Sequence, residues 1–354
     1  MHDLREVFEL VTKQTEPDLD SWRKQEVRQR RTSRNRKLGA IGLVAALVMG
    51  LVVFALTRLP GGNGMPAKSV SVTPSVPVDA TPPIGPQLMA PDGTPVQQLP
   101  PSIAGGLALA LSPDGTTVAY MDIADGLRMV AVDGSDDRAL TDRGSNSGDA
   151  MDHVSWSPEG SKVAYAWSGE IYVANADGSG GHRLTHSAPG TGSYYPAWSP
   201  DGSTIAYWSG SSTVVDGGPS DAEIYTIPAS GGKPRQLTHD RAHNIEPAWS
   251  PDGTQIAFKH GWGLGEMNAD GTGLHDIYSV KHGPWAPAWS PDGTAIAFTV
   301  FDPSERALDG GPLLQMRILT LASGKVTRLS VRAETDLNGP QWISDGEILI
   351  NRYN

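Results

Sequence analysis

Four carboxylates recur at one place in a repeated phrase, and they are the first candidates for chemistry. Asp114, Asp201, Asp252 and Asp292 each stand between Pro and Gly in copies of the phrase Ser-Pro-Asp-Gly. Regularly spaced carboxylates suit calcium binding or acid–base catalysis, but turn chemistry accounts for them without a ligand. Pro presets φ, Asp can accept a hydrogen bond from its own backbone two residues on, and Gly takes the positive φ that closes a hairpin. We therefore assign these carboxylates to turns.

Histidines are the second group of candidate residues. Six of the nine fall near the ends of expected outer strands or in the loops that follow: His182, His186, His239, His243, His275 and His282. The phrase Leu-Thr-His at 184–186 returns at 237–239, which marks it as part of a structural repeat. Their spacing matches no metal-binding pattern, so we predict no metal site.

Motifs for catalysis and cofactor binding are absent from the sequence. No Ser has Gly at both −2 and +2, and there is no His-Glu-x-x-His helix, Walker loop or dinucleotide fingerprint. The chain has no Cys, which excludes disulfides and thiolate metal ligands. We predict a protein without catalytic residues and without a cofactor, and not an enzyme.

The turn phrase belongs to a repeat that recurs six times after residue 110. From one motif Gly to the next the steps are 45, 42, 51, 40 and 53 residues. An alternating stretch such as 255–258 follows each copy, and a second hairpin, such as 223–237, follows that stretch in the first five repeats. Four strands in a period of 40 to 50 residues are typical of a propeller blade.

The final repeat has only two strands before the chain ends. The missing outer hairpin is present at the other end of the repeat region, in residues 87–99, which resemble the outer hairpin of the third repeat. We therefore predict an all-β fold, a six-bladed β-propeller whose last blade contains strands from both termini. Such closure leaves no long open sheet edge.

With these repeats, residues 86–354 resemble the TolB-type six-bladed propellers, whose repeat is called the PD40 or WD40-like motif. The resemblance implies a periplasmic or otherwise extracytoplasmic propeller. It implies no single activity, because such propellers serve as binding platforms, as scaffolds and as accessory domains of peptidases.

The chain before the propeller indicates a membrane anchor. Residues 38–57 contain no charge and would give about 30 Å of helix, enough to cross a bilayer. Eight basic residues lie at 23–37 against one acid, so the positive-inside rule keeps the N-terminus in the cytoplasm and exports the propeller. We expect a cytoplasmic tail at 1–37, an uncleaved transmembrane helix at 38–57, a Pro-, Gly-, Ser- and Thr-rich linker at 58–85 and the propeller at 86–354.

The cytoplasmic tail has an apolar stripe formed by Leu4, Val7, Phe8 and Val11 at helical spacing. The stripe fits a helix lying on the inner membrane face, or a docking peptide for a cytoplasmic regulator. The tail carries a net charge of +3. Because the whole chain carries −11, the residues after the tail carry −14. An acidic exported domain is a poor partner for nucleic acid, and we predict none.

Candidate binding residues follow from the register of the repeat. If the strand that ends in the motif is innermost, the third and fourth residues before the repeated Trp lie at the mouth of the central channel, and they vary from blade to blade. We call the polar and aromatic members of this set the mouth residues: Asp152, His153, Tyr194, Tyr195, Glu246, Trp285 and Asn338. The long connections 209–222 and 301–314 should reach the same face and could clamp a partner.

Three functions fit these features. The leading hypothesis is a membrane-tethered extracytoplasmic platform that binds a protein, peptide or cell-envelope component. The second is a transmembrane signalling protein with the propeller as sensor and the tail as effector. The third is a hydrolase or lyase of envelope polymers that would use Asp152, His153, Tyr195 or Glu246. Under the first, Glu246→Ala and Tyr195→Ala should weaken binding with little loss of stability, whereas Asp252→Ala should mainly reduce stability.

Overall fold

A computed structural model of the protein describes part of the chain. The described residues are 85–90, 95–100, 103, 107–122, 126–141, 153–211, 221–279, 283–306, 312–333, 339–343 and 347–352. All of them lie in the second of the two units into which the chain divides, Asp79–Asn354. The expected tail at 1–37, the membrane span at 38–57 and the linker up to residue 84 lie outside them. In the described part of the chain no helix is long and apolar enough to cross a bilayer.

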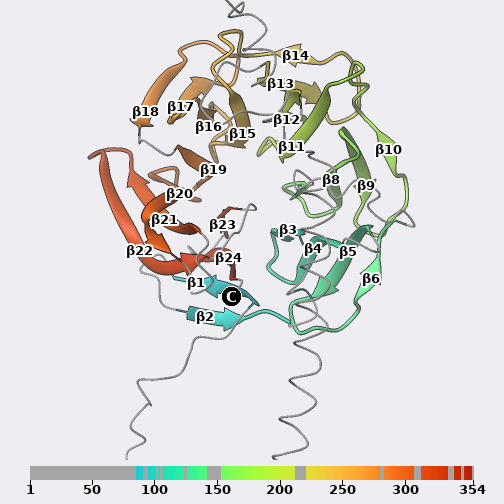
Figure 1. Cartoon of the computed structure of the whole chain (residues 1–354). Helices are drawn as coiled ribbons and strands as arrows, with labels where there is room; N and C mark the ends of the chain where they lie inside the picture. The colour runs from blue at the N-terminus through green and yellow to red at the C-terminus, as the bar shows by residue number, and fades with distance from the viewer. Residues whose placement is uncertain are drawn as a thin grey trace, which may run out of the picture. The chain divides into compact units, whose positions relative to one another are not determined.

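The described strands form six four-stranded antiparallel sheets, the blades of a propeller (Figure 1). The innermost strands are β3 (Leu107–Leu111), β7 (Val154–Trp156), β11 (Gly192–Trp198), β15 (Asn244–Trp249), β19 (Pro284–Trp289) and β23 (Gln341–Trp342). The second strands are β4 (Thr117–Asp122), β8 (Lys162–Trp167), β12 (Thr204–Gly210), β16 (Gln255–His260), β20 (Ala295–Arg306) and β24 (Ile348–Arg352). The third strands are β5 (Gly126–Ala131), β9 (Glu170–Asn175), β13 (Glu223–Pro228), β17 (Gly263–Asn268), β21 (Pro312–Thr320) and β1 (Gly85–Met89). The outermost strands are β6 (Arg138–Ala139), β10 (His182–Arg183), β14 (Arg235–Gln236), β18 (His275–Ser279), β22 (Lys325–Ala333) and β2 (Pro95–Gln98).

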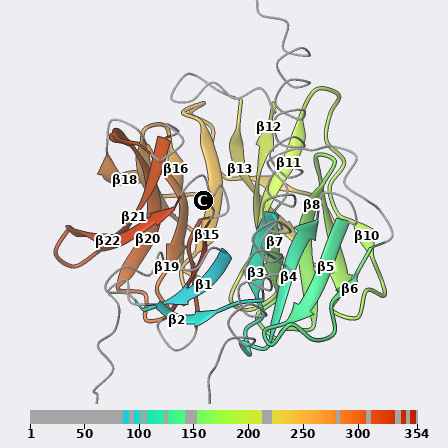
Figure 2. The same cartoon turned by 60° about the horizontal axis from the view of Figure 1, so that its bottom comes forward.

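Both ends of the propeller contribute to the sixth blade, which confirms the predicted closure. Its strand order is β2-β1-β24-β23, and β1 pairs with β24 from Gly85↔Arg352 to Met89↔Ile348. Figures 1 and 2 place β1 and β2 between blade 5 and blade 1. The six-bladed fold with four strands in each blade is therefore as predicted.

The hydrophobic core lies between neighbouring sheets, and the second strands are buried on both faces. In β16, Ile256 and Phe258 pack in a cluster with Trp208 of blade 3, while Ala257 packs with Trp289 of blade 5. A strand covered on both sides has apolar residues at successive positions and not only at alternate ones. This explains the continuous apolar runs that follow each turn phrase.

Three of the repeated Trp side chains hydrogen-bond their blade to the one before it. The indole Nε1–H of Trp156, Trp249 and Trp289 donates to the carbonyl of Ala110, Ala197 and Ala248, at 3.0, 3.1 and 3.2 Å. Blade 1 has Leu111 in place of this Trp. There the Gln341 amide both accepts from the Leu111 N–H at 2.8 Å and donates to its carbonyl at 3.0 Å, so the blades that meet at closure are also hydrogen-bonded.

The connection 301–314, which was expected to be a loop, is partly strand. In blade 5 the hairpin of β20 and β21 continues beyond the length of the other blades, with Phe301↔Leu314 and Asp302↔Leu313 in register. The long connection of blade 3 is outside the described residues from 212 to 220.

Candidate functional site

A cavity of about 560 Å³ lies along the axis of the propeller and is lined by the innermost strands of all six blades. The strand that ends in the turn phrase is therefore innermost, as the register of the mouth residues required. At one end the lining repeats Ser and Pro of the phrase, for example Ser199 and Pro200. At the other end the lining includes His153, Tyr195 and Glu246, so the blades differ there.

A β-bulge shapes this variable end of the cavity. The residues three before the repeated Trp, or before Leu111 in blade 1, have positive φ in five blades: Ala108 (54°), Tyr195 (54°), Glu246 (59°), Ala286 (48°) and Gly339 (66°). The pairing with the second strand is interrupted there, for example between Tyr194 and Ala197. A bulge bends the strand and redirects its side chains. Sequence reasoning missed this feature, although Pro at 196, 247, 287 and 340 was a signal, because Pro inside a sheet favours bulges.

His153 and Tyr195 form a stacked pair at the cavity wall. Their ring centroids are 4.4 Å apart with an interplanar angle of 18°. Burial lowers the pKa of His153 to about 4, although its hydrogen bond to the Pro196 backbone raises it in part. The imidazole is therefore neutral at physiological pH. Within the described part of the chain its Nδ1 is buried and has no hydrogen-bond partner, so it is an unsatisfied acceptor in the cavity wall.

Glu246 connects blade 4 to blade 5. Its side chain is buried, and its Oε2 accepts a hydrogen bond of 2.5 Å from the Ala286 N–H. Removal of a buried acceptor leaves that amide unsatisfied, which costs about 1–3 kcal/mol. Glu246→Ala should therefore also reduce stability, which changes the expectation from sequence that this substitution would be nearly neutral.

The remaining mouth residues divide into buried and undescribed positions. Tyr194 is buried against Trp208, with ring centroids 4.6 Å apart. Trp285 is partly buried, and the Nζ of the fully buried Lys259 lies 3.0 Å from its ring centroid, a cation–π contact. Asp152 and Asn338 lie outside the described residues. The structure thus brings His153, Tyr195 and Glu246 to one cavity, with Trp285 beside it.

Trp262 is a candidate that sequence reasoning did not select. It lies in the short turn between β16 and β17, and 41% of its surface is exposed. His260, which precedes this turn, pairs with Asn244 at the start of β15, so Trp262 lies at the same end of the propeller as Glu246. We call residues 260–263 the Trp262 hairpin.

The carboxylates of the turn phrase bond within their own turns, as the turn assignment predicts. The Asp252 Oδ1 accepts from Ser250 Oγ at 2.6 Å, from the Thr254 N–H at 3.0 Å and from Thr254 Oγ1 at 2.9 Å. Asp114, Asp201 and Asp292 have the same pattern. The hydrogen bonds from Ser250 and Thr254 lower the pKa of Asp252 below its ordinary value.

Replacing Asp252 should therefore reduce the stability of the protein without changing the cavity. It should also make that stability less sensitive to acid. A carboxylate with a lowered pKa contributes stability that is present above the ordinary pKa of 3.8 and is lost as pH falls through the folded-state value. We expect Asp252→Ala to lower the midpoint of thermal unfolding modestly at pH 7, with a difference from wild type that vanishes in acid. Asp252→Asn, which keeps an acceptor oxygen, is the control. A difference that persists unchanged at low pH would contradict this role.

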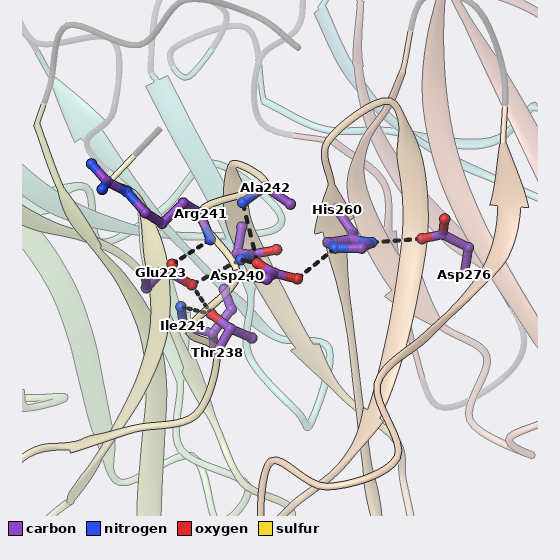
Figure 3. A network of polar contacts seen from close by, with 9 residues as sticks. Glu223, Ile224, Thr238, Asp240, Arg241, Ala242, His260 and Asp276 are labelled. Atoms are coloured by element: carbon purple, nitrogen blue, oxygen red, sulfur yellow. Dashed lines mark hydrogen bonds and ion pairs between the residues drawn. The ribbon is translucent and has the colours of Figure 1, made fainter. Parts of the chain in front are cut away.

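The histidines of the repeat also bond locally. His182 Nδ1 and His275 Nδ1 lie 2.9 Å from the carbonyl oxygens of Gly180 and Gly273. In the Leu-Thr-His phrases it is the Thr that bonds across the blade, because Thr185 and Thr238 donate to Glu170 and Glu223. In the described residues no group of three or more His, Cys, Asp and Glu could hold a metal ion. Figure 3 shows a polar network between blades 3 and 4 that includes His260, a residue that sequence reasoning had not singled out.

Comparisons with known proteins agree with the fold. Residues 86–260 match the PD40 family, described as the TolB beta propeller domain. The solved structure of a putative TolB from Agrobacterium tumefaciens is 23% identical and superposes with a TM-score of 0.59 over 76% of this chain and 98% of that chain. TolB from Acinetobacter baumannii is 17% identical, with a TM-score of 0.52 over 73% of this chain and 65% of that chain.

Among curated proteins, dipeptidyl peptidase 4 of Felis catus is 50% identical over 32 residues. That match spans 9% of this chain and only 4% of the peptidase. It covers less than one repeat and carries no information on activity. The family match and the six blades of the described structure together give the assignment: the chain belongs to the PD40, TolB-like β-propeller family.

Proposed function

We propose that the protein is an extracytoplasmic binding platform, tethered to the membrane by residues 38–57, that recognises a protein, peptide or cell-envelope component at the mouth of its central cavity. The observation that carries the proposal is the difference between the two ends of that cavity. One end repeats Ser and Pro from blade to blade, whereas the other presents His153, Tyr195 and Glu246. Variation on a regular scaffold is where binding specificity usually resides.

The chemistry of the mouth suits a partner that offers apolar surface and hydrogen-bond donors. His153 supplies a neutral acceptor beside the Tyr195 ring, and the exposed Trp262 lies at the same end of the propeller. Trp is one of the residue types enriched among those that dominate binding energy at interfaces. We therefore place the binding surface over blades 2 to 4, from His153 to the Trp262 hairpin. On this proposal the protein acts by binding and not by catalysis.

Capture of partners by the full-length protein tests this assignment. We expect Trp262→Ala to reduce capture from a cell-envelope extract about tenfold or more, because a Trp at the centre of an interface contributes about 2 kcal/mol or more. Val96→Ala is the matched control, since Val96 is 50% exposed on β2, the outermost strand of blade 6. Protease treatment of the extract then distinguishes a protein partner from a wall polymer. Equal capture by wild type and Trp262→Ala would exclude this surface.

The signalling alternative depends on the tail. Its stripe of Leu4, Val7, Phe8 and Val11 lies outside the described residues, and the tail as effector stays a prediction. Capture from a whole-cell extract with Leu4→Asp and Phe8→Asp addresses it, because these changes should remove a cytoplasmic partner and retain an envelope partner.

A further inference from the structure

A histidine held between two carboxylates connects blade 3 to blade 4 (Figure 3). His260 Nδ1 lies 2.6 Å from Asp276 Oδ1, and His260 Nε2 lies 2.9 Å from Asp240 Oδ2. Asp276 is in β18 of blade 4, whereas Asp240 is in the segment 239–243 that leaves blade 3, which we call the exit loop. Both ring nitrogens are therefore bonded to acids from different blades.

The sequence of β17 makes room for this arrangement. His260 is in β16 and Asp276 is in β18, so the ring must reach across the strand between them. Gly263 and Gly265 occupy β17 at that place. A Cβ on Gly265 would lie 2.8 Å from the His260 Cβ, and a Cβ on Gly263 would lie 3.2 Å from the Asp276 Oδ1. The two glycines thus leave the space that lets His260 reach a carboxylate two strands away.

The exit loop is fixed to both blades by further hydrogen bonds. Asn244 Nδ2 donates to Asp240 Oδ1 at 2.6 Å and to Glu223 Oε2 of blade 3 at 2.8 Å. Glu223 also accepts from the Arg241 N–H at 2.9 Å. On the other side, the Gly261 N–H of the Trp262 hairpin donates to the His243 carbonyl at 3.3 Å. Movement of the exit loop would therefore displace the Trp262 hairpin, which lies at the mouth end of the propeller.

The two bonds of His260 require a protonated ring. A neutral imidazole has one N–H and can donate to one carboxylate, whereas an imidazolium donates to both. Burial lowers the pKa of His260, but the bonds to Asp276 and Asp240 raise it by more than burial lowers it. The pKa of His260 therefore lies above the ordinary 6.5. Burial raises the pKa of Asp240, but bonds from Asn244, His260 and the Ala242 N–H bring it below the ordinary 3.8.

Other charged groups near His260 do not change the direction of its pKa shift, which Asp276 and Asp240 determine. Glu223 bonds to Asn244 and to the Arg241 N–H and not to the ring, and the Arg241 side chain points away from His260 (Figure 3). Glu266, 3.9 Å from His275, alternates with Gly263 and Gly265 along β17 and so faces the opposite side of the sheet. Because the pKa of His260 is raised, the stability it contributes is present below pH 6.5 and is lost as pH rises through the folded-state value.

We propose that Asp240, His260 and Asp276 form a proton-dependent latch that holds the exit loop of blade 3 against the Trp262 hairpin of blade 4. Loss of the proton removes one of the two bonds and leaves a carboxylate next to a ring lone pair. The bond to Asp240 is the longer of the two and is the one that is lost, so the exit loop keeps its backbone bond from Gly261 but loses its side-chain bond to blade 4. The mouth of the cavity then loosens on its blade 3 and blade 4 side. The latch does not depend on the proposed function, since its opening needs no ligand.

Hydrogen exchange of the full-length protein tests the latch. We expect amides in 239–244 and 260–264 to lose protection, after correction for the intrinsic rate, as pH rises from about 6 to about 9 through the titration of His260. In His260→Gln the protection of these segments should be low and independent of pH. His275→Gln is the matched control, because His275 is on the same blade outside the latch and should behave like wild type. The same pH-dependent loss in His260→Gln and wild type would overturn the proposal.

A second measurement keeps the proposal open to refutation if His260→Gln does not fold. The NMR titration of His260, measured in wild type and in Asp276→Asn, reports the two carboxylates directly. We expect a midpoint above 6.5 in wild type and a lower one in Asp276→Asn, since Asp276 holds the imidazolium form. A wild-type midpoint at or below 6.5, or one that Asp276→Asn leaves unchanged, would show that no latch exists.

Discussion

Deletion of residues 86–99 should lower the midpoint of thermal unfolding by about 10 °C or more. The deletion removes β1 and β2 and with them the pairing of β1 with β24. It also removes Leu88 and Leu99, which are 6% and 1% exposed and pack in a cluster with Leu109 and Val118 of blade 1. Loss of each buried Leu costs about 2–5 kcal/mol, and 1 kcal/mol shifts the midpoint by about 2–4 °C in a domain near this size.

The matched control deletes residues 66–79, a segment of the same length from the predicted linker. Both variants shorten the chain equally, but only the first removes a pair of strands from a blade. The thermal unfolding of both variants and of wild type, followed by near-ultraviolet circular dichroism, checks the prediction. Unchanged unfolding of the 86–99 deletion would mean that the ring does not need these strands.

Replacement of Gly339 by Ala should be the most damaging single-methyl change at the cavity. A Cβ on Gly339 would lie 2.1 Å from the Cβ of Ala286 and 3.0 Å from its carbonyl oxygen. Gly339 also has a φ of +66°, which costs an Ala about 1 kcal/mol. Overpacking adds about 1–3 kcal/mol, so the midpoint of thermal unfolding should fall by roughly 5–10 °C.

Two further variants separate steric overlap from backbone strain. Gly324 has a similar φ of +63°, but a Cβ there would meet nothing within 4 Å, so Gly324→Ala should show only the backbone cost. Ala286→Gly removes the atom that would collide and should restore most of the stability of Gly339→Ala. If the double variant is no more stable than Gly339→Ala, contact between blades 5 and 6 at this point is not the cause.

The blades could be predicted from the sequence because their signals are local. The turn phrase recurs, and each of its side chains closes the same hairpin, as the bonds of Asp252 show. Closure was predictable for the same reason, since the unpaired hairpin at 87–99 matched the place of the missing strands. The innermost position of the motif strands followed from the architecture of propellers in general.

The details of the candidate site depend on contacts between blades, which periodicity does not report. Glu246 varies between blades as a binding residue would, yet its carboxylate holds the Ala286 N–H of the next blade. His260 carried no motif, because its partners Asp240 and Asp276 lie 20 and 16 residues away and on different strands or loops. Trp262 resembled the other Trp residues until its exposure was known. Gly263 and Gly265 were a signal in the sequence, because they leave the space through which His260 reaches Asp276. That signal could be interpreted only once the register of β16, β17 and β18 was known.

The pairing of β1 with β24 has a consequence for synthesis on the ribosome. Among the described strands, the one that is made first, Gly85–Met89, pairs with the one that is made last, Ile348–Arg352. Blades 1 to 5 can each form from neighbouring segments as they emerge, but the sixth cannot be completed until β23 and β24 have been made. The nascent chain must therefore keep the edge of β1 unpaired throughout elongation, when exposed strand edges are prone to aggregate. The arrival of β24, and not the appearance of any earlier blade, is the event that permits the ring to close.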